Sequence, residues 1–258
     1  MSVSQIAAPA RAAGGLFAFM LDVFMALFKR PFQMREFLLQ AYFTIRVTIV
    51  PTALVAIPFG AVIALQVGGL IKQFGAQSFT GSAAVLAVVR NAGPIATALL
   101  IAGAAGSAIA ADFGARKIRE ELDAMMVLGI DPIQRLVVPR VLAVMLIAVF
   151  LNGLVTFVGV AGGYVFNVLL QDGTPGAYLA SFTALAQLPD ILQGMVKAVI
   201  FGFLAAIVAS YKGMNAKGGP KGVGDAVNEA VVITFVLLFA VNFVVSALYI
   251  QLVPPKGL

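Results

Sequence analysis

Five long apolar stretches dominate this chain, and they restrict its fold more than any other feature of the sequence. A helix needs about 20 mostly apolar residues to cross the hydrocarbon core of a bilayer. Because lipid offers no partners to backbone N–H and C=O groups, a stretch of this length is predicted to be helical throughout. The stretches that qualify lie at 47–71, 81–111, 136–170, 190–210 and 226–252.

The composition excludes most other classes of protein. Apolar residues form 61% of the chain and charged residues 11%, whereas soluble proteins average about 45–50% and about 25%. Nothing resembling a polar linker interrupts the apolar pattern, so residues 1–258 are predicted to form one all-α integral membrane domain. The chain has no Cys and no His, so we expect no catalytic site, no metal site and no cofactor bound by this chain.

A Phe-rich segment at 16–42 precedes the first span. Charged residues such as Asp22, Lys29 and Glu36 interrupt its apolar runs, which are too short to cross a membrane. We therefore expect an amphipathic helix that lies in the membrane interface. A signal peptide is the alternative, but Asp22 would fall within its apolar core and no small-residue cleavage site follows.

The positions of the basic residues predict the orientation of the chain. If the N-terminus is cytoplasmic, thirteen of the 17 Lys and Arg residues lie in cytoplasmic segments. Only Lys72 and Lys256 then lie outside, while Arg90 and Lys197 fall within spans. The positive-inside rule therefore places the N-terminus in the cytoplasm and the C-terminus outside. The same distribution accounts for the net charge of +6 without a nucleic-acid partner.

The segment between the second and third spans is unusually charged for this chain. Residues 116–140 carry nine of its 28 charged side chains. The spacing of the apolar residues predicts a short cytoplasmic amphipathic helix at 115–129, which Gly129 would end. Asp131 and Pro132 form a typical cap and first turn for the next helix.

Intrinsic stability does not explain so much charge in this predicted helix. Pairs of basic and acidic residues four positions apart would contribute at most about 0.2–0.5 kcal/mol each. A solvated loop that enforces topology would account for the arginines, but not for the neighbouring acids, the apolar stripe and the caps. Apolar anchors beside carboxylates favour a helix that docks into the groove of a partner.

The same residues carry a specific resemblance. The stretch EELDAMMVLGIDPIQRLVVPRVLA, at 120–143, resembles the signature of the MlaE/YrbE permease family, the membrane subunits of Mce-type ABC lipid transporters. The similarity extends upstream through 91–125 and includes the five-span layout. In that family the segment is a coupling helix that docks into a cytoplasmic ATPase. The resemblance assigns this role to Arg119, Glu120, Glu121, Asp123, Met125, Met126, Gly129 and Asp131.

The resemblance also implies partners. A P-loop needs a Gly-Lys pair to hold phosphates, and none of the 26 glycines of this chain precedes a lysine. We therefore expect two copies of a separate ABC ATPase subunit, which would bind ATP and Mg. The family further implies a second YrbE-type permease subunit, identical or related, Mce-domain proteins on the periplasmic side, and a location in the plasma (inner) membrane.

Polar residues in the second span are the candidate lipid-cavity residues. Arg90 would lie about 14 Å from the start of its span, too deep for easy snorkelling, so a cavity-facing position is favoured. Asn91 follows it, and Pro94 removes a helix hydrogen bond nearby. A cation beside a kink would suit a lipid carboxylate or phosphate. Lys197, seven residues after Asp190, is expected to be a snorkelling anchor.

Two positions depart from the pattern that the resemblance implies. Phospholipid-handling members typically have a glutamate where Asn91 stands and an arginine where Ala104 stands. The loss of both polar groups favours the actinobacterial YrbE branch. A fatty acid, a mycolic-type lipid or a sterol is then the expected cargo in preference to a phospholipid.

Small residues recur at helical spacing in three spans. Lipid cancels the hydrophobic drive between helices, so such residues let backbones pack closely. Packing within one subunit is the commoner outcome, although some of these faces would meet a second permease copy. The strips comprise Gly103, Gly106 and Ser107 in the second span, Gly60, Ala64 and Gly68 in the first, and Gly159 and Gly163 in the third.

Together these features predict a non-catalytic permease subunit. It would couple ATP hydrolysis by its partner to the movement of a hydrophobic lipid between the membrane and an Mce protein assembly. The alternative is an ion-coupled secondary transporter or channel subunit, although the spans lack the ladder of carboxylates or histidines typical of proton pathways. Its relay groups would be Arg90, Asp190, Lys197 and Glu229. An intramembrane enzyme ranks last, because the sequence offers no Ser/His/Asp set.

Overall fold

The computed structural model describes residues 3–75, 80–170, 174–185 and 187–253. Every regular element in these residues is a helix. Five helical segments are long and apolar enough to span a membrane, which confirms the predicted all-α fold with five spans. They are Met34–Ile71, Gly81–Ile118, Ile133–Leu169, Leu188–Met214 and Gly219–Leu252. A short apolar helical segment, Ala13–Ala26, precedes them.

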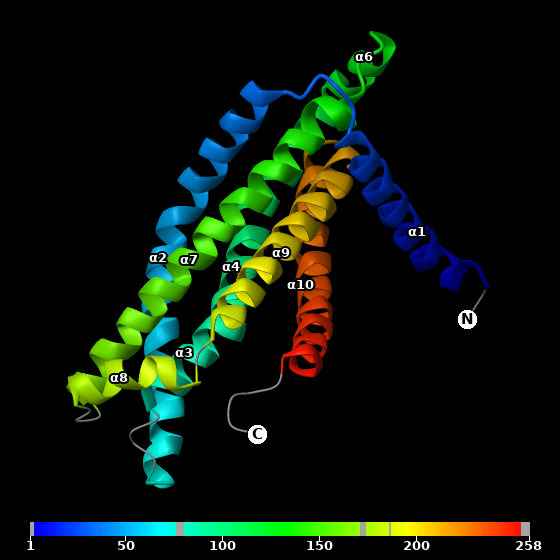
Figure 1. Ribbon diagram of the computed structural model, residues 1–258. Helices are drawn as coiled ribbons and strands as arrows, with labels where there is room; N and C mark the ends of the chain where they lie inside the picture. The colour runs from blue at the N-terminus through cyan, green and yellow to red at the C-terminus, as the bar shows by residue number, and fades with distance from the viewer. Residues whose placement is uncertain (1–2, 76–79, 171–173, 186, 254–258) are drawn as a thin grey trace. The chain divides into compact units, whose positions relative to one another are not determined.

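The chain forms two compact units, and the long helices contribute to both. Unit 1 comprises Met1–Ile45, Ile101–Leu146 and Gly202–Val236, and unit 2 comprises Arg46–Leu100, Ile147–Phe201 and Leu237–Leu258. The elements of unit 1 (Figure 1) are α1 (Val3–Ala26), η3 (Ile101–Gly106), α5 (Ser107–Ile118), α6 (Glu121–Val127), η4 (Ile133–Val137) and parts of α2 (Met34–Gln73), α7 (Val138–Leu170), α9 (Leu188–Met214) and α10 (Gly219–Leu252). The η elements are π-helical.

Close helix packing in unit 1 depends on small residues. A Cβ atom added to Gly213 of α9 would lie 2.6 Å from the carbonyl oxygen of Ala110 in α5. A Cβ atom on Gly114 would lie 2.9 Å from a methyl group of Val223 in α10. Side chains larger than glycine would therefore push these helices apart. Phe113, fully buried, fills the interior beside them.

The N-terminal segment is divided differently from the single helix expected at 16–42. α1 ends at Ala26, and α2 begins at Met34 and continues without interruption through the first span to Gln73. Pro31 lies between the two helices. Proline lacks an N–H group and disfavours helical geometry in the residue before it, which accounts for the break.

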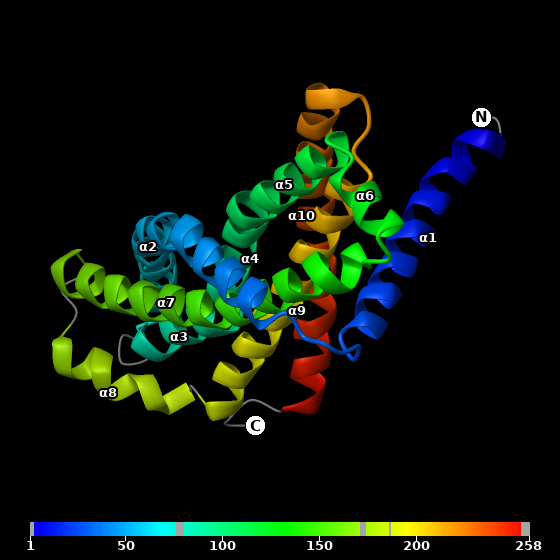
Figure 2. The same ribbon diagram turned by 90° about the horizontal axis from the view of Figure 1, so that it is seen from above.

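Unit 2 contains α3 (Thr80–Ala87), η2 (Val88–Ala92), α4 (Gly93–Leu100), α8 (Pro175–Leu185) and the remaining parts of α2, α7, α9 and α10. α3 and α8 lie side by side in both views (Figure 1 and Figure 2). The glycine strips of the first and third spans meet here, because a Cβ atom on Gly60 would lie 2.6 Å from the Cα atom of Gly159. A Cβ atom on Gly163 would be 3.4 Å from that of Ala64. These strips therefore pack within one subunit.

Candidate functional site

The connector, residues 119–131, links the second span to the third and contains most of the predicted coupling helix at 115–129. That helix is not continuous over 115–129: α5 ends at Ile118 and α6 begins at Glu121. Between them, Glu120 adopts a left-handed conformation with φ of +58°. The chain turns at this residue, and Leu122 just beyond it is buried. Figure 1 shows α6 at one end of unit 1.

Both predicted caps of the connector are present. Gly129 has φ of +74°, and its N–H donates to the carbonyl oxygen of Met126 at 3.0 Å. The N–H of Ile130 donates to the carbonyl oxygen of Met125 at 2.9 Å, which completes a Schellman motif. The carboxylate of Asp131 then accepts from the N–H of Ile133 at 2.9 Å and caps η4. The C-terminal end of the connector is therefore held in a fixed conformation by hydrogen bonds among its own residues and to the start of the third span.

Ion pairs join the two sides of the break in the connector. Lys117 binds Asp123 at 2.8 Å, and Arg119 binds Glu121 at 2.7 Å. Their spacings differ from the four-residue pairs of a straight helix, because the left-handed turn brings other residues together. Since these groups are partly exposed, each pair is worth only about 0–1 kcal/mol. The acids remain accessible to a partner.

The connector also presents an apolar surface. Val127 is 88% exposed, Leu128 75% and Met126 57%. Met125, predicted as an anchor, is half-buried, whereas Val127 was not predicted. The predicted apolar stripe follows the spacing of an unbroken helix, whereas the turn at Glu120 changes which side chains face outward. Exposed apolar side chains beside carboxylates are typical of a docking surface.

A buried arginine joins the two spans that flank the connector. Arg140, 3% exposed, donates from Nη2 to the carboxylate of Asp112 at 2.6 Å. Arg116 donates to the same carboxylate oxygen at 3.1 Å. The guanidinium of Arg140 also lies 4.4 Å from the ring centroid of Phe113, a cation–π contact. The second and third spans are therefore held together where the connector leaves them.

In unit 2, the π-helical segment η2 directly precedes Gly93 and Pro94, where the sequence predicts a kink. In an α-helix the carbonyl oxygen of Arg90 would accept from the N–H of residue 94, but proline has none. The ammonium of Lys197 donates to this carbonyl oxygen instead, at 2.7 Å. It also donates to Asn91 at 3.2 Å and to Ser246 at 2.8 Å. Lys197 thus replaces the donor that Pro94 lacks.

The prediction that Lys197 is a snorkelling anchor is wrong. Its side chain is 0% exposed, because its ammonium group is turned inward to the three oxygens described above. Sequence position suggested an interfacial lysine, since Asp190 precedes it by two turns. The partners come from α10 and η2, which are distant in sequence, and only the folded unit brings them to Lys197.

Arg90 forms an ion pair within the same unit. Its Nε donates to the carboxylate of Asp190 at 2.6 Å, and the hydroxyl of Tyr249 donates to the same oxygen at 2.7 Å. Arg90 remains 25% exposed, whereas Asp190 is almost fully buried. We call these groups the kink cluster: Arg90, Asn91, Asp190, Lys197, Ser246 and Tyr249. Its two cations and one carboxylate leave one positive charge in excess, which would suit an anionic group.

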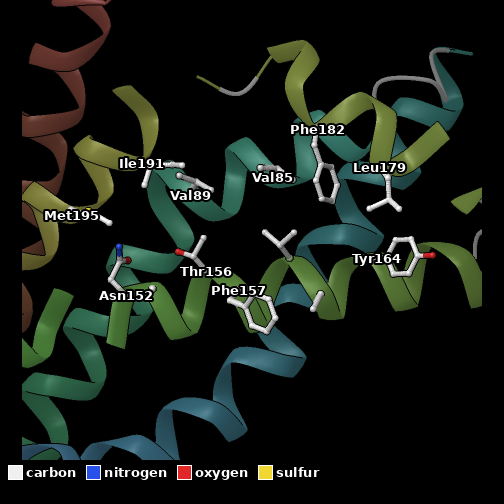
Figure 3. Close-up of a pocket in the computed structure, with 13 residues that line it drawn as sticks. Val85, Val89, Asn152, Thr156, Phe157, Tyr164, Leu179, Phe182, Ile191 and Met195 are labelled. Carbon is white, nitrogen blue, oxygen red and sulfur yellow. The ribbon is translucent and has the colours of Figure 1, made fainter. Parts of the chain in front are cut away.

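Unit 2 also contains an apolar cavity with a volume of about 540 Å³ (Figure 3). It lies between α3, η2, α7, α8 and α9, and Arg90, Asn91 and Pro94 are not among its lining residues. Its walls include Val85, Val89, Phe157, Phe182 and Ile191. Tyr178 of α8 packs against Phe182, with ring centroids 5.2 Å apart, and burial raises the pKa of its hydroxyl to about 12.

The predicted helix-packing residues of the second span lie in different surroundings. Gly106 is buried, and a Cβ atom there would lie 3.9 Å from that of Ala209, an ordinary contact. Gly103 is exposed, and a Cβ atom there would meet nothing within 4 Å. Ser107 donates its hydroxyl to the carbonyl oxygen of Gly103. Gly103 therefore does not mediate a close helix contact within unit 1.

The fold and these sites define a class: a multi-pass helical membrane subunit with an exposed, capped connector between two spans and no nucleotide-binding motif of its own. This is the class of ABC transporter permeases. The model of the permease family MlaE matches residues 37–248, and the chain belongs to this family.

Curated relatives agree with this assignment. A probable ABC transporter permease protein of Synechocystis sp., slr1045, is 39% identical over 192 residues, which cover 74% of this chain and 73% of the relative. The intermembrane phospholipid transport system permease protein MlaE of Haemophilus influenzae is 29% identical over 190 residues, 73% of each chain. TRIGALACTOSYLDIACYLGLYCEROL 1 of Arabidopsis thaliana is 34% identical over 175 residues, 66% of this chain and 49% of the relative.

Proposed function

We propose that this permease subunit converts ATP hydrolysis by a partner ABC ATPase into the movement of a hydrophobic lipid between the membrane and an Mce protein assembly. The observation that carries the proposal is the connector. It is capped at both ends, exposes Val127 and Leu128, and links two spans that the ion pair of Arg140 with Asp112 holds together. A movement of the ATPase against such an ordered element would move the two spans, whereas a flexible loop would change its own conformation instead.

The proposed assembly has two ATPase copies, which bind ATP and Mg, and a second permease subunit, identical or related. The residues that would contact the ATPase, or shape this contact, are Arg119, Glu120, Glu121, Asp123, Met125, Met126, Gly129 and Asp131. In this proposal the connector and the N-terminus are cytoplasmic, as the distribution of basic residues favours. The permease name of the Haemophilus relative, a phospholipid transport protein, supports a lipid as cargo.

We also propose that Arg90, Asn91 and Pro94 border the path of the lipid's polar group. The excess positive charge of the kink cluster supports this role. An ion-coupled transporter, the alternative function, would use Arg90, Asp190, Lys197 and Glu229 as relay groups. Asp190 is already neutralised by Arg90, and Lys197 is held by three oxygens, so the described residues favour a structural network over a relay.

The docking proposal predicts that an exposed apolar anchor is needed for ATPase binding. Replacing Val127 with Asp should reduce the amount of P-loop ATPase that copurifies with the tagged permease by about tenfold, because a charge would face the partner's apolar groove. Glu121→Lys combined with Asp123→Lys should have the same effect. Phe74→Asp is the matched control, since Phe74 is 84% exposed but lies at the end of α2. Undiminished ATPase recovery from Val127→Asp membranes would contradict the proposal.

A further inference from the structure

The turn between α9 and α10, residues 215–222, lies beside the end of α5, from which the connector starts. A Cβ atom added to Gly114, near the end of α5, would lie 2.9 Å from a methyl group of Val223, which directly follows the turn. Both residues belong to unit 1. In Figure 1 the turn lies at the same end of unit 1 as α6. A protein that binds the connector therefore comes within reach of this turn.

Three glycines give the turn a specific shape. Gly218 has φ of +83° and Gly219 has φ of +74°, a backbone conformation that other residues rarely adopt. A Cβ atom on Gly222 would overlap the carbonyl oxygen of Lys217. Lysines that served only to fix the membrane topology would need no particular backbone shape, because topology depends on their number and side of the membrane. The shape of the turn therefore points to a contact.

The turn presents two lysines to solvent. Lys217 and Lys221 are both exposed, and neither forms an ion pair with another described residue. The nearby Lys212 is different, because it binds the carboxylate of Glu229 at 2.6 Å. The turn thus holds two cations whose charge is not used within the part of the chain that the structure describes.

A polar hollow of about 430 Å³ lies between the ends of α9 and α10 that the turn connects. Side chains of both charges line it, namely Lys212, Lys217, Asp225 and Glu229. A hollow of this size can admit a side chain from a partner protein. Charges of both signs around it would fix the register of such a contact.

An anionic membrane surface is the other partner that exposed lysines could bind. Segments that bind acidic lipids typically gather about 4–8 Lys or Arg residues next to a span. Residues 211–229 contain three lysines against two carboxylates, a net charge of +1. This balance, together with the hollow, favours a protein partner over lipid headgroups.

We propose that the α9–α10 turn is a second docking surface for the ABC ATPase that binds the connector, with Lys217 and Lys221 in contact with acidic side chains of that ATPase. The connector would supply apolar anchors and carboxylates, and the turn would supply cations. Two contacts of different charge would fix the orientation of the ATPase on unit 1 as well as its position. The inference rests on the proposed function and adds a surface that the connector does not include.

Charge reversal in the turn tests this surface. Lys217→Glu combined with Lys221→Glu should reduce the ATPase that copurifies per tagged, membrane-inserted permease by about tenfold. Because salt screens exposed ion pairs, ATPase binding by this variant should also depend less on NaCl concentration than binding by the native chain. Lys217→Arg combined with Lys221→Arg keeps both charges and should retain native recovery.

Arg30→Glu combined with Arg35→Glu is the matched control. Both arginines are exposed, belong to unit 1 and lie in the N-terminal segment that is predicted to be cytoplasmic. The change in net charge is the same as in the lysine variant. A general effect of lost basic charge on topology or insertion would reduce ATPase recovery in both variants, whereas a contact at the turn would leave the arginine variant at the native level.

Undiminished ATPase recovery from the lysine variant, or an equal loss in the arginine variant, would overturn the second surface. So would a lysine variant that keeps its ATPase but loses bound phosphatidylglycerol in native mass spectrometry, since the lysines would then contact the membrane. The connector is tested separately by Val127→Asp. Loss of the ATPase in Val127→Asp with full recovery in the lysine variant would refute only this inference, whereas the opposite result would refute only docking at the connector.

Discussion

At the scale of single residues, the most informative contact in unit 2 is the hydrogen bond from Lys197 to the carbonyl oxygen of Arg90, because Pro94 has no N–H group to donate to this oxygen. A proline within a span removes one backbone hydrogen bond, and lipid supplies no replacement. The ammonium group of Lys197 donates the missing hydrogen bond to this carbonyl oxygen. A buried lysine, which is costly by itself, is therefore coupled to a buried proline.

This coupling predicts a non-additive double mutant. Lys197→Met should cost about 1–3 kcal/mol more in the native chain than in a Pro94→Ala background, because alanine restores the N–H that satisfies the Arg90 carbonyl. The free energy of unfolding in detergent measures both effects. Pro58→Ala, another proline inside a helix, is the control background and should give no rescue. Additive losses from Lys197→Met and Pro94→Ala would show that the two residues act independently.

At the scale of elements, the helix predicted at 115–129 consists of two pieces, the end of α5 and the whole of α6. Glu120 takes a left-handed conformation between α5 and α6, where glycine would be favoured. For an L-residue this conformation costs about 1–2 kcal/mol. Since α6 is only seven residues long, its order depends on this turn, its Schellman motif and the burial of Leu122.

Relief of this strain should be measurable. Glu120→Gly and Glu120→Ala both remove the carboxylate, but only glycine removes the cost of the left-handed conformation. We expect the free energy of opening of α6 to be about 1 kcal/mol higher in Glu120→Gly than in Glu120→Ala. Hydrogen exchange at the amide of Ala124, which donates to the carbonyl oxygen of Glu120, reports this difference. Equal exchange rates in the two variants would argue that α6 does not depend on the turn.

At the scale of the whole molecule, the chain is a multi-pass membrane protein, and the proposed coupling role depends on its orientation. The basic residues favour a cytoplasmic connector, and the coupling proposal requires one. The natural sequence has no Cys, so single cysteines can report which side of the membrane each segment faces.

Two exposed positions make a matched pair for this measurement. Val127 is 88% exposed in the connector, and Phe74 is 84% exposed at the end of α2. In intact cells a membrane-impermeant maleimide should label Phe74→Cys and should reach Val127→Cys only after permeabilisation, because the positive-inside rule places them on opposite sides. The reverse pattern would invert the proposed topology and with it the coupling role of the connector.

Periodicity and composition were sufficient to predict the five spans, the caps at Gly129 and Asp131, and the glycine strips of the first and third spans. These features depend on contacts close in the chain or on the lipid environment, so their physical causes are present in the local sequence. The break at Glu120 was missed because no glycine or proline marks it. The exposed position of Val127 was not predicted, because the turn at Glu120 changes which side chains of the next helix face outward.

By itself, the sequence determined that this chain is a helical membrane protein with a capped, charged connector, because hydrophobic length and backbone capping act over a few turns. Only the tertiary structure decided that Lys197 is buried against Arg90, that Asp190 neutralises the same arginine, and that Asn152 lines an apolar cavity. Each of these environments is made by helices far apart in the sequence, and burial and pairing energies exist only once those helices pack.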